Sequence, residues 1–393
     1  MHFYLNPLNM DFSELYELER QARKDGNSEE LKNIFMKMIS LCGDDREVVS
    51  LIRVLSARRG QDRNSIRWLV NHVYSQKKIN FPNDWTDFAK DLLSDVVEGK
   101  MFLEEERVLL TTDLKNHCLK NNNITEALNL ILNVPVETFT MIPESTIINY
   151  QLEQFRLCVE TKDWIRSDIT MRKIRKKYFK ENKAINEEIL FYKYIIDLYL
   201  GQEKFFEASI TYSKLNEIVD NSEYTILASF YAILCTCEGE VRDIREERKE
   251  RLKKLKEDKN NEEGMRIILD KFLSDLIISK EIIEDLNNLN MYLNMNMDYT
   301  PFILRSINEH NFFIIEKFYS SISLRTCIQL LDLDLEILLD KINFMVNNKM
   351  SKAKINQKEG IIVFGGKEWS NEVGEVLNKI IRVDHLIHKE KLK

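Results

Sequence analysis

The sequence predicts a mainly α-helical fold: a TPR-like solenoid of paired helices, then a winged helix, then one further helix suited to a helical bundle. Three observations lead to this prediction. Only 5 Pro and 11 Gly interrupt the 393 residues, so long segments contain no helix breaker. Helix starts of similar composition recur about 40 residues apart in the middle of the chain. The last third combines short helices with a β-hairpin.

The first 80 residues show helical patterns separated by polar breaks. Asp11–Cys42 reads as a helical pair that is interrupted near Lys24–Asn27. Two further helical patterns cover Asp45–Arg59 and Asn64–Gln76, and Asn80–Asp84 reads as a loop.

Three helix starts then repeat at a fixed spacing. Each follows a polar turn and opens on a large apolar residue, with steps of 40 and 41 residues: Ile124, Trp164 and Phe205. A small residue follows three positions later in each case: Ala127, Ser167 and Ala208. A small residue at this point lets two helices approach closely, as stacked antiparallel pairs require. The alternative is chance similarity among three ordinary helix starts.

The segment from Glu309 to Phe364 has the element order of a winged helix. We expect an amphipathic helix over Glu309–Ser321, two capped helices, and a hairpin. We expect Ser323 to cap the first of these helices and Asp334 to cap the second. The two helices and the two strands are Leu324–Leu331, Leu335–Val346, Ala353–Asn356 and Ile361–Phe364.

Charge favours a winged helix that binds protein over one that reads DNA. The second helix of a DNA-reading pair carries basic or amide side chains toward bases and phosphates. Here Asp332–Lys341 contains four acids and one base, so phosphate would be repelled. Three lysines in the hairpin, Lys352, Lys354 and Lys358, compensate only modestly.

The chain after Gly365–Gly366 predicts one final helix that begins at Ser370. Its apolar residues step by 3 and 4 positions and form a narrow seam of the kind used in bundles: Val373, Val376, Ile380, Val383 and Ile387. The seam could pack on its own domain or join helices of other chains. The predicted domains are therefore a helical-repeat arm at 1–220, a domain at 221–364 with the winged helix at about 301–364, and the C-terminal helix at 365–393.

Composition argues against several functions. The net charge is −7, which disfavours a generic nucleic-acid or anionic-membrane partner. No secretory signal and no apolar run of membrane-spanning length occur, so we expect a cytoplasmic and nuclear protein. The six cysteines form no C-x-x-C pair and read as reduced thiols. The alternating charges of Glu238–Gly264 predict a solvated helix followed by a loop.

No motif predicts an enzyme, a cofactor site or a metal site. Glycine-rich phosphate loops are missing, and His385 and His388 lack a third ligand. The basic segment Arg172–Lys177, followed by Tyr178 and Phe179, is the best candidate for nucleic-acid binding. The alternative is a helix that buries its apolar residues, Tyr178 among them, and solvates the lysines and arginines.

Several collinear segments resemble those of the PCI family, whose members are scaffold subunits of the proteasome lid, the COP9 signalosome and eukaryotic initiation factor three. These segments span almost the whole chain: Leu55–Gln61, Glu98–Arg107, Val136–Phe139, Arg156–Cys158, Lys162–Arg166, Glu309–Asn311, Gln329–Leu333, Gly360–Phe364, Trp369–Ser370 and His385–Ile387.

The resemblance implies a non-catalytic structural subunit of the proteasome lid. Its partners would be other lid PCI subunits, the lid metal-dependent deubiquitinase and the ATPase ring. It also implies that Ile361, Ile362 and Val363 lie on a strand available for sheet-edge contact, and that the seam from Val376 to Ile387 joins a bundle. Scaffolds of the COP9 signalosome, or of an initiation factor with RNA contacts, are the alternatives.

Overall fold

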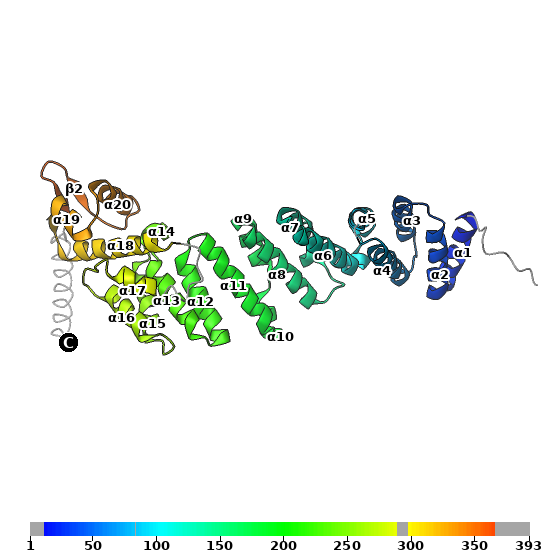
Figure 1. Ribbon diagram of the computed structural model, residues 1–393, viewed down its shortest axis with the longest axis horizontal. Coiled ribbons are helices and arrows are strands. Elements are labelled where there is room, and N and C mark those ends of the chain that lie inside the picture. Colours follow the sequence, from blue (N-terminus) through cyan, green and yellow to red (C-terminus); the bar gives the residue numbers. More distant parts are fainter. Residues whose placement is uncertain (1–11, 83, 289–297, 366–393) are drawn as a thin grey trace, which may run out of the picture. The chain divides into compact units, whose positions relative to one another are not determined.

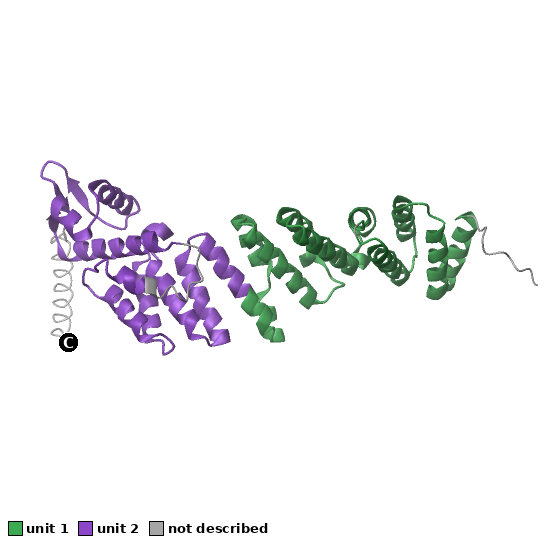
Figure 2. Ribbon diagram, in the orientation of Figure 1, with its two compact units in different colours: residues 1–190 green, residues 191–393 purple. Residues whose placement is uncertain are grey.

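The computed structural model describes residues 12–82, 84–288 and 298–365. They are mainly helical and include one three-stranded sheet (Figure 1). The chain divides into two compact units, residues 1–190 and 191–393 (Figure 2). The division falls within helix α11 (Ile185–Gly201).

The first unit is built from helices joined by short turns. Its helices, including the π-helix η1 and the 3₁₀ helices η2 and η3, are α1 (Phe12–Asp25), α2 (Ser28–Ser40), α3 (Asp45–Ala57), α4 (Arg63–Asn80), α5 (Thr86–Leu92), η1 (Leu93–Val97), η2 (Met101–Leu103), α6 (Glu104–Lys120), α7 (Ile124–Leu132), η3 (Val136–Thr138), α8 (Glu144–Glu160), α9 (Trp164–Lys173) and α10 (Lys176–Asn182). The helices predicted before residue 80 are confirmed, each to within a few residues at its ends.

The second unit combines helices with the small sheet. Its elements after α11 are α12 (Phe205–Val219), α13 (Ser222–Leu234), α14 (Cys237–Glu240), α15 (Arg245–Glu257), α16 (Glu263–Leu273), α17 (Ile282–Asn288), α18 (Thr300–Phe318), β1 (Ser321–Ser323), α19 (Leu324–Leu331), α20 (Leu335–Asn347), β2 (Lys354–Asn356) and β3 (Ile361–Val363).

The predicted repeat is confirmed at its turns. Helices α7, α9 and α12 begin at the three predicted large residues, and the three predicted small residues are all fully buried. Two positions before each start, a non-glycine residue has a positive φ: 56° at Asn122, 57° at Lys162 and 57° at Glu203. The next residue donates its backbone N–H to a carbonyl five positions back in the preceding helix. The spacing of about 40 residues therefore separates three turns that share one backbone conformation.

Apolar side chains supply the cores of both units. In the first unit they form a contiguous cluster from Leu15 to Leu114 and a second cluster around α7 and α8. The second unit has an aromatic group in which Tyr231 stacks on Tyr212, with ring centroids 5.4 Å apart, and contacts Phe205, Phe230 and Tyr299. Such burial is the main source of stabilisation.

The C-terminal module, which we define as residues 300–364, contains the predicted helices and hairpin and one strand more. Helix α18 begins at Thr300 and ends at Phe318, so it is longer at its start and shorter at its end than predicted. Ser323 caps α19 as predicted, because its hydroxyl accepts from the backbone N–H of Thr326 at 3.0 Å. Asp334 precedes α20 as predicted, but its side chain forms no cap hydrogen bond. The additional strand, β1, pairs antiparallel with β3.

Candidate interaction surfaces and the Glu309 cluster

Strand β3 is the central strand of the sheet. The order is β1-β3-β2, and both neighbours are antiparallel to β3. The expectation that Ile361, Ile362 and Val363 offer a free sheet edge is therefore wrong, because the backbone of this strand pairs on both sides. The outer edges of the sheet belong to Ser321–Ser323 and Lys354–Asn356.

The two faces of the sheet differ in burial. Ile362 is fully buried and lies in register with the buried Ile322. Val363 is 40% exposed and lies between Ser321 and Lys354. Alternation along a strand thus makes Ile362 a core residue and leaves Val363 on the outer face.

Helix α20, the second helix of the predicted pair, presents acidic and apolar side chains. Glu336 and Asp340 are exposed, and Ile337 is 53% exposed. The one base, Lys341, is buried and lies 3.7 Å from the Glu238 carboxylate. Burial lowers the Lys341 pKa, and the nearby carboxylates oppose this shift. The surface is consequently more acidic than the sequence count indicates, which further disfavours DNA.

The basic segment of the first unit, Arg172–Lys177, and the two residues after it bury their aromatic side chains. Ile174, Tyr178 and Phe179 are 3%, 8% and 2% exposed. Lys173 pairs with Glu137 at 2.7 Å, and Arg175 pairs with two glutamates at 2.9 Å. Bases that stack on a protein need exposed rings, so this segment fits the alternative of a buried apolar face.

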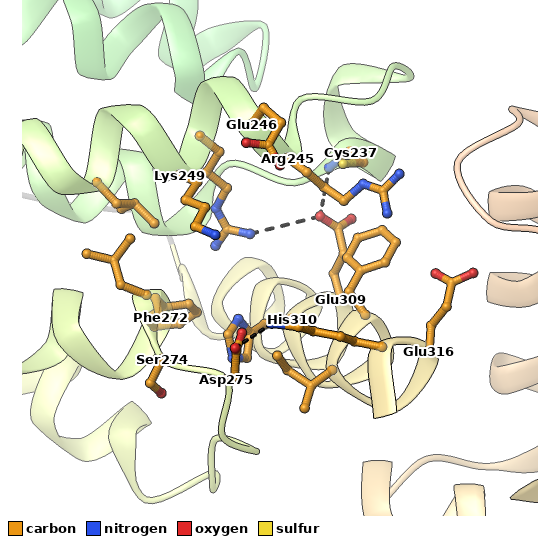
Figure 3. A pocket seen from close by; sticks show the side chains of 16 residues that line it. Cys237, Arg245, Glu246, Lys249, Phe272, Ser274, Asp275, Glu309, His310 and Glu316 are labelled. Carbon is orange, nitrogen blue, oxygen red and sulfur yellow. Dashed lines mark hydrogen bonds and ion pairs between the residues drawn. The ribbon is translucent and has the colours of Figure 1, made fainter. Parts of the chain in front are cut away.

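A buried carboxylate, Glu309 of α18, organises the polar interior of the second unit (Figure 3). It is 1% exposed and accepts backbone N–H groups at the start of α14, from Cys237 at 2.9 Å and from Glu238 at 3.2 Å. A guanidinium nitrogen of Arg248 lies 4.0 Å away. We call these residues, together with Ser306 and Lys341, the Glu309 cluster. In this cluster, the buried Glu309 carboxylate is stabilised by the Arg248 guanidinium and by the backbone N–H groups at the start of α14.

The charged segment 238–264 is only partly solvated, contrary to expectation. Arg248 is buried and donates to the Ile233 carbonyl and to the Ser306 hydroxyl, both at 2.8 Å. Arg251 is half-buried and donates to the Ser209 carbonyl at 2.7 Å. Two arginines of the alternating run therefore connect α15 to other helices of the unit.

The residues that follow Glu309 secure a chain segment that has no regular structure. The Asn311 amide accepts from the Ile278 N–H at 2.8 Å and donates to the carbonyl of the same residue at 2.9 Å. The ring of His310 lies 3.1 Å from the Leu276 carbonyl oxygen, and burial lowers the His310 pKa to about 4. Glu309–Asn311 thus connects α18 to two separate segments.

A cavity of about 430 Å³ adjoins this cluster (Figure 3). Its lining mixes bases and acids, and Arg245, which pairs with Asp243 at 2.6 Å, lies over the Phe313 ring. Burial raises the pKa of the Cys237 thiol to about 12, so the thiol stays protonated and weakly nucleophilic. The lining offers no activated nucleophile paired with a base.

Within residues 12–82, 84–288 and 298–365, no group of three His, Cys, Asp or Glu side chains could hold a metal ion. Within the same ranges, no helix has the length and apolarity needed to cross a membrane. The predicted seam (Val373, Val376, Ile380, Val383 and Ile387) lies outside the described residues, as do His385 and His388, so its role stays a prediction.

Comparison with known proteins identifies the family. The model described as PSMD12/CSN4, N-terminal, matches residues 12–223, which is more than half of the chain. The chain belongs to the PSMD12/CSN4 family. A second model, the 26S proteasome regulatory subunit RPN5 C-terminal domain, matches residues 367–392.

Curated relatives match this family member over nearly its whole length. It is 24% identical to the Dictyostelium discoideum 26S proteasome non-ATPase regulatory subunit 12, over 95% of this chain and 87% of that protein. It is 24% identical to the Saccharomyces cerevisiae 26S proteasome regulatory subunit RPN5, over 98% and 92%. The Arabidopsis thaliana 26S proteasome non-ATPase regulatory subunit 12 homolog A is 25% identical to it, over 95% and 94%.

Proposed function

We propose that this protein is a non-catalytic structural subunit of the 26S proteasome regulatory particle lid and supports ATP-dependent degradation of ubiquitinated proteins. The observation that carries the proposal is the RPN5-type match over residues 367–392, which follows a family match over 12–223. The N-terminal family name covers both PSMD12 and CSN4, whereas the C-terminal match names a proteasome subunit alone. The named relatives are likewise proteasome subunits.

The geometry supports a scaffold that works through surfaces. Among the described residues, the edge strands β1 and β2 of the C-terminal module each pair with β3 alone, and the outer face of the sheet carries Val363. A partner strand can add to such an edge through main-chain hydrogen bonds. We therefore assign the sheet contact to the edges, with Ile361 and Val363 on the outer face and Ile362 supporting them from the core.

The partners proposed are other PCI subunits of the lid, its metal-dependent deubiquitinase and the ATPase ring, in the cytoplasm and the nucleus. The seam from Val373 to Ile387 is proposed to join a helical bundle with neighbouring subunits. We therefore expect the residues needed for assembly near the C-terminal end of the chain.

Native affinity purification of the full-length tagged protein, followed by mass spectrometry, tests the proposal. We expect recovery of the other lid subunits, the deubiquitinase and the ATPase ring. A second tagged chain that lacks Ser370–Lys393 should fold but fail to recover them. Recovery of a cullin-associated complex, or of initiation factors and ribosomal proteins, would overturn the proteasome assignment. Normal incorporation of the truncated chain would overturn the bundle contact.

A further inference from the structure

Helix α9 of the arm exposes an apolar pair that its own repeat does not require. Ile165 is 77% exposed and Ile169 is 52% exposed. Positions i and i+4 of a helix are neighbours on one face, so the two side chains form one small patch. Scattered exposed apolar residues are ordinary, but here two of them adjoin on a single helix.

The neighbouring repeats show that this patch is particular to α9. One period earlier, the same positions on α7 are Thr125 and Asn129, which are exposed and polar. One period later, on α12, they are Phe206 and Ile210, which are only partly exposed. The turn conformation that precedes these helices is the same in all three cases, so the turn does not account for the exposed isoleucines.

The patch continues into the most basic part of the arm. Arg172 lies three positions after Ile169, on the same side of α9, and is exposed. Residues 164–180 contain seven Lys or Arg and a single Asp in a chain of net charge −7. Three of these bases, Arg166, Lys173 and Arg175, pair with carboxylates of the chain that include Asp163 and Glu181 at the two ends of this stretch. Arg172, Lys177 and Lys180 are exposed. An acidic ligand is therefore favoured next to the apolar pair.

We propose that the α9 patch (Ile165, Ile169 and Arg172) docks an acidic amphipathic segment of another protein, with the exposed Lys177 on the following helix, α10, adding positive charge. Two apolar side chains of that segment contact Ile165 and Ile169, and its carboxylates lie next to the basic residues. A nucleic acid fits less well, because Tyr178 and Phe179 are buried and phosphate contacts give no role to the two isoleucines. This docking site would add a contact of the helical repeats to the C-terminal contacts proposed above. The docking proposal rests on the proposed function only in the choice of the particle in which it is tested.

Site-specific photo-crosslinking in the native particle tests this docking site. A benzoylphenylalanine replaces Ile169 in the tagged full-length chain, and a matched chain carries it at Asn129, the equivalent exposed position on α7. After irradiation of the purified particle, we expect position 169 alone to capture another protein. The captured peptide should contain two apolar residues three or four positions apart, followed by Asp or Glu.

Charge reversal completes the test. In a chain with Arg172→Glu and Lys177→Glu, we expect the crosslink yield at position 169 to fall about fivefold, and in the unreversed chain it should also fall at high salt. Crosslinks to RNA, to this chain itself, or at equal yield from position 129 would overturn the docking proposal, as would no crosslink at all. Absence of proteasome subunits from the purified particle would overturn the proposed function instead, because the crosslink identifies its partner in any assembly.

Discussion

The repeat turns and the Glu309 cluster show two ways in which this protein fixes its helices. Each repeat turn uses residues close in sequence: a left-handed residue and a small residue that is buried, with a side-chain cap in the first two turns. The Glu309 cluster brings together Cys237, Arg248 and Glu309, which are separated by up to 72 residues. Local chemistry repeats and is therefore visible in a sequence, whereas a long-range polar contact occurs once and depends on the complete fold.

Loss of the buried carboxylate should have the largest effect. Glu309→Ala removes the acceptor of two backbone N–H groups and leaves Arg248 buried without its carboxylate. We expect the free energy of unfolding of the second unit to fall by about 3–5 kcal/mol, measured by urea denaturation with hydrogen exchange at Cys237 and Glu238. Glu309→Gln keeps the shape and an acceptor and should cost less. A loss under about 1 kcal/mol for the alanine variant would show that the cluster does not stabilise the unit.

Overfilling a repeat turn should have the next largest effect. Ala127 is fully buried between α7 and its neighbours, so Ala127→Leu must displace packed side chains. We expect a destabilisation of about 1–3 kcal/mol by thermal unfolding. Thr125→Leu, two positions earlier in α7 and exposed, should change stability little. Equal effects of the two substitutions would contradict the role assigned to the small residue.

The caps offer a smaller and more exact test of repeat equivalence. Asn123 and Asp163 each accept a backbone N–H three residues later, at 3.2 and 3.1 Å, whereas Lys204 makes no side-chain cap. Asn123→Ala should cost about 1 kcal/mol, and Lys204→Asp should stabilise α12 by a comparable or smaller amount. Denaturant midpoints measure both. No gain from Lys204→Asp would mean that the third turn is not equivalent to the first two.

The smallest expected effect is a dependence on pH. Because the His310 pKa is lowered to about 4 in the folded protein from an ordinary 6.5, folding favours the neutral ring. The contribution of the neutral His310 ring to the free energy of unfolding is fully present above pH 6.5 and is lost as the pH falls toward 4. The loss amounts to about 1 kcal/mol or less once solvent screening is included. Unfolding midpoints at pH 7 and pH 5 should differ less for His310→Gln than for the unaltered chain. An unchanged difference would exclude His310 as the source.

The sequence located most helices because their starts depend on neighbouring residues. Ile124, Trp164 and Phe205 were placed at helix starts by the polar turn before them. Strand β1 was missed because Ser321–Ser323 has a single apolar residue and becomes a strand only by pairing with β3, about 40 residues later. Without β1, the central position of β3 could not be predicted.

Buried charges were also missed, for a related reason. The alternating run around Arg248 reads as solvated because no local signal distinguishes the arginine that faces Ser306. Glu19 of α1 behaves in the same way, since it is buried and accepts from Arg58 at 2.5 Å. The partner of each such residue lies on a distant element, and only the fold brings the two together.

The left-handed residues of the three repeat turns bear on how such proteins are recognised. Asn122, Lys162 and Glu203 occupy a conformation that suits glycine, yet none of them is glycine. Each position accepts about 1–2 kcal/mol of backbone strain, which close helix packing can balance. A solenoid whose turns do not require glycine can keep its architecture while the residues at those turns change during evolution. Distant relatives can then share a repeat that a search for glycine motifs would not detect.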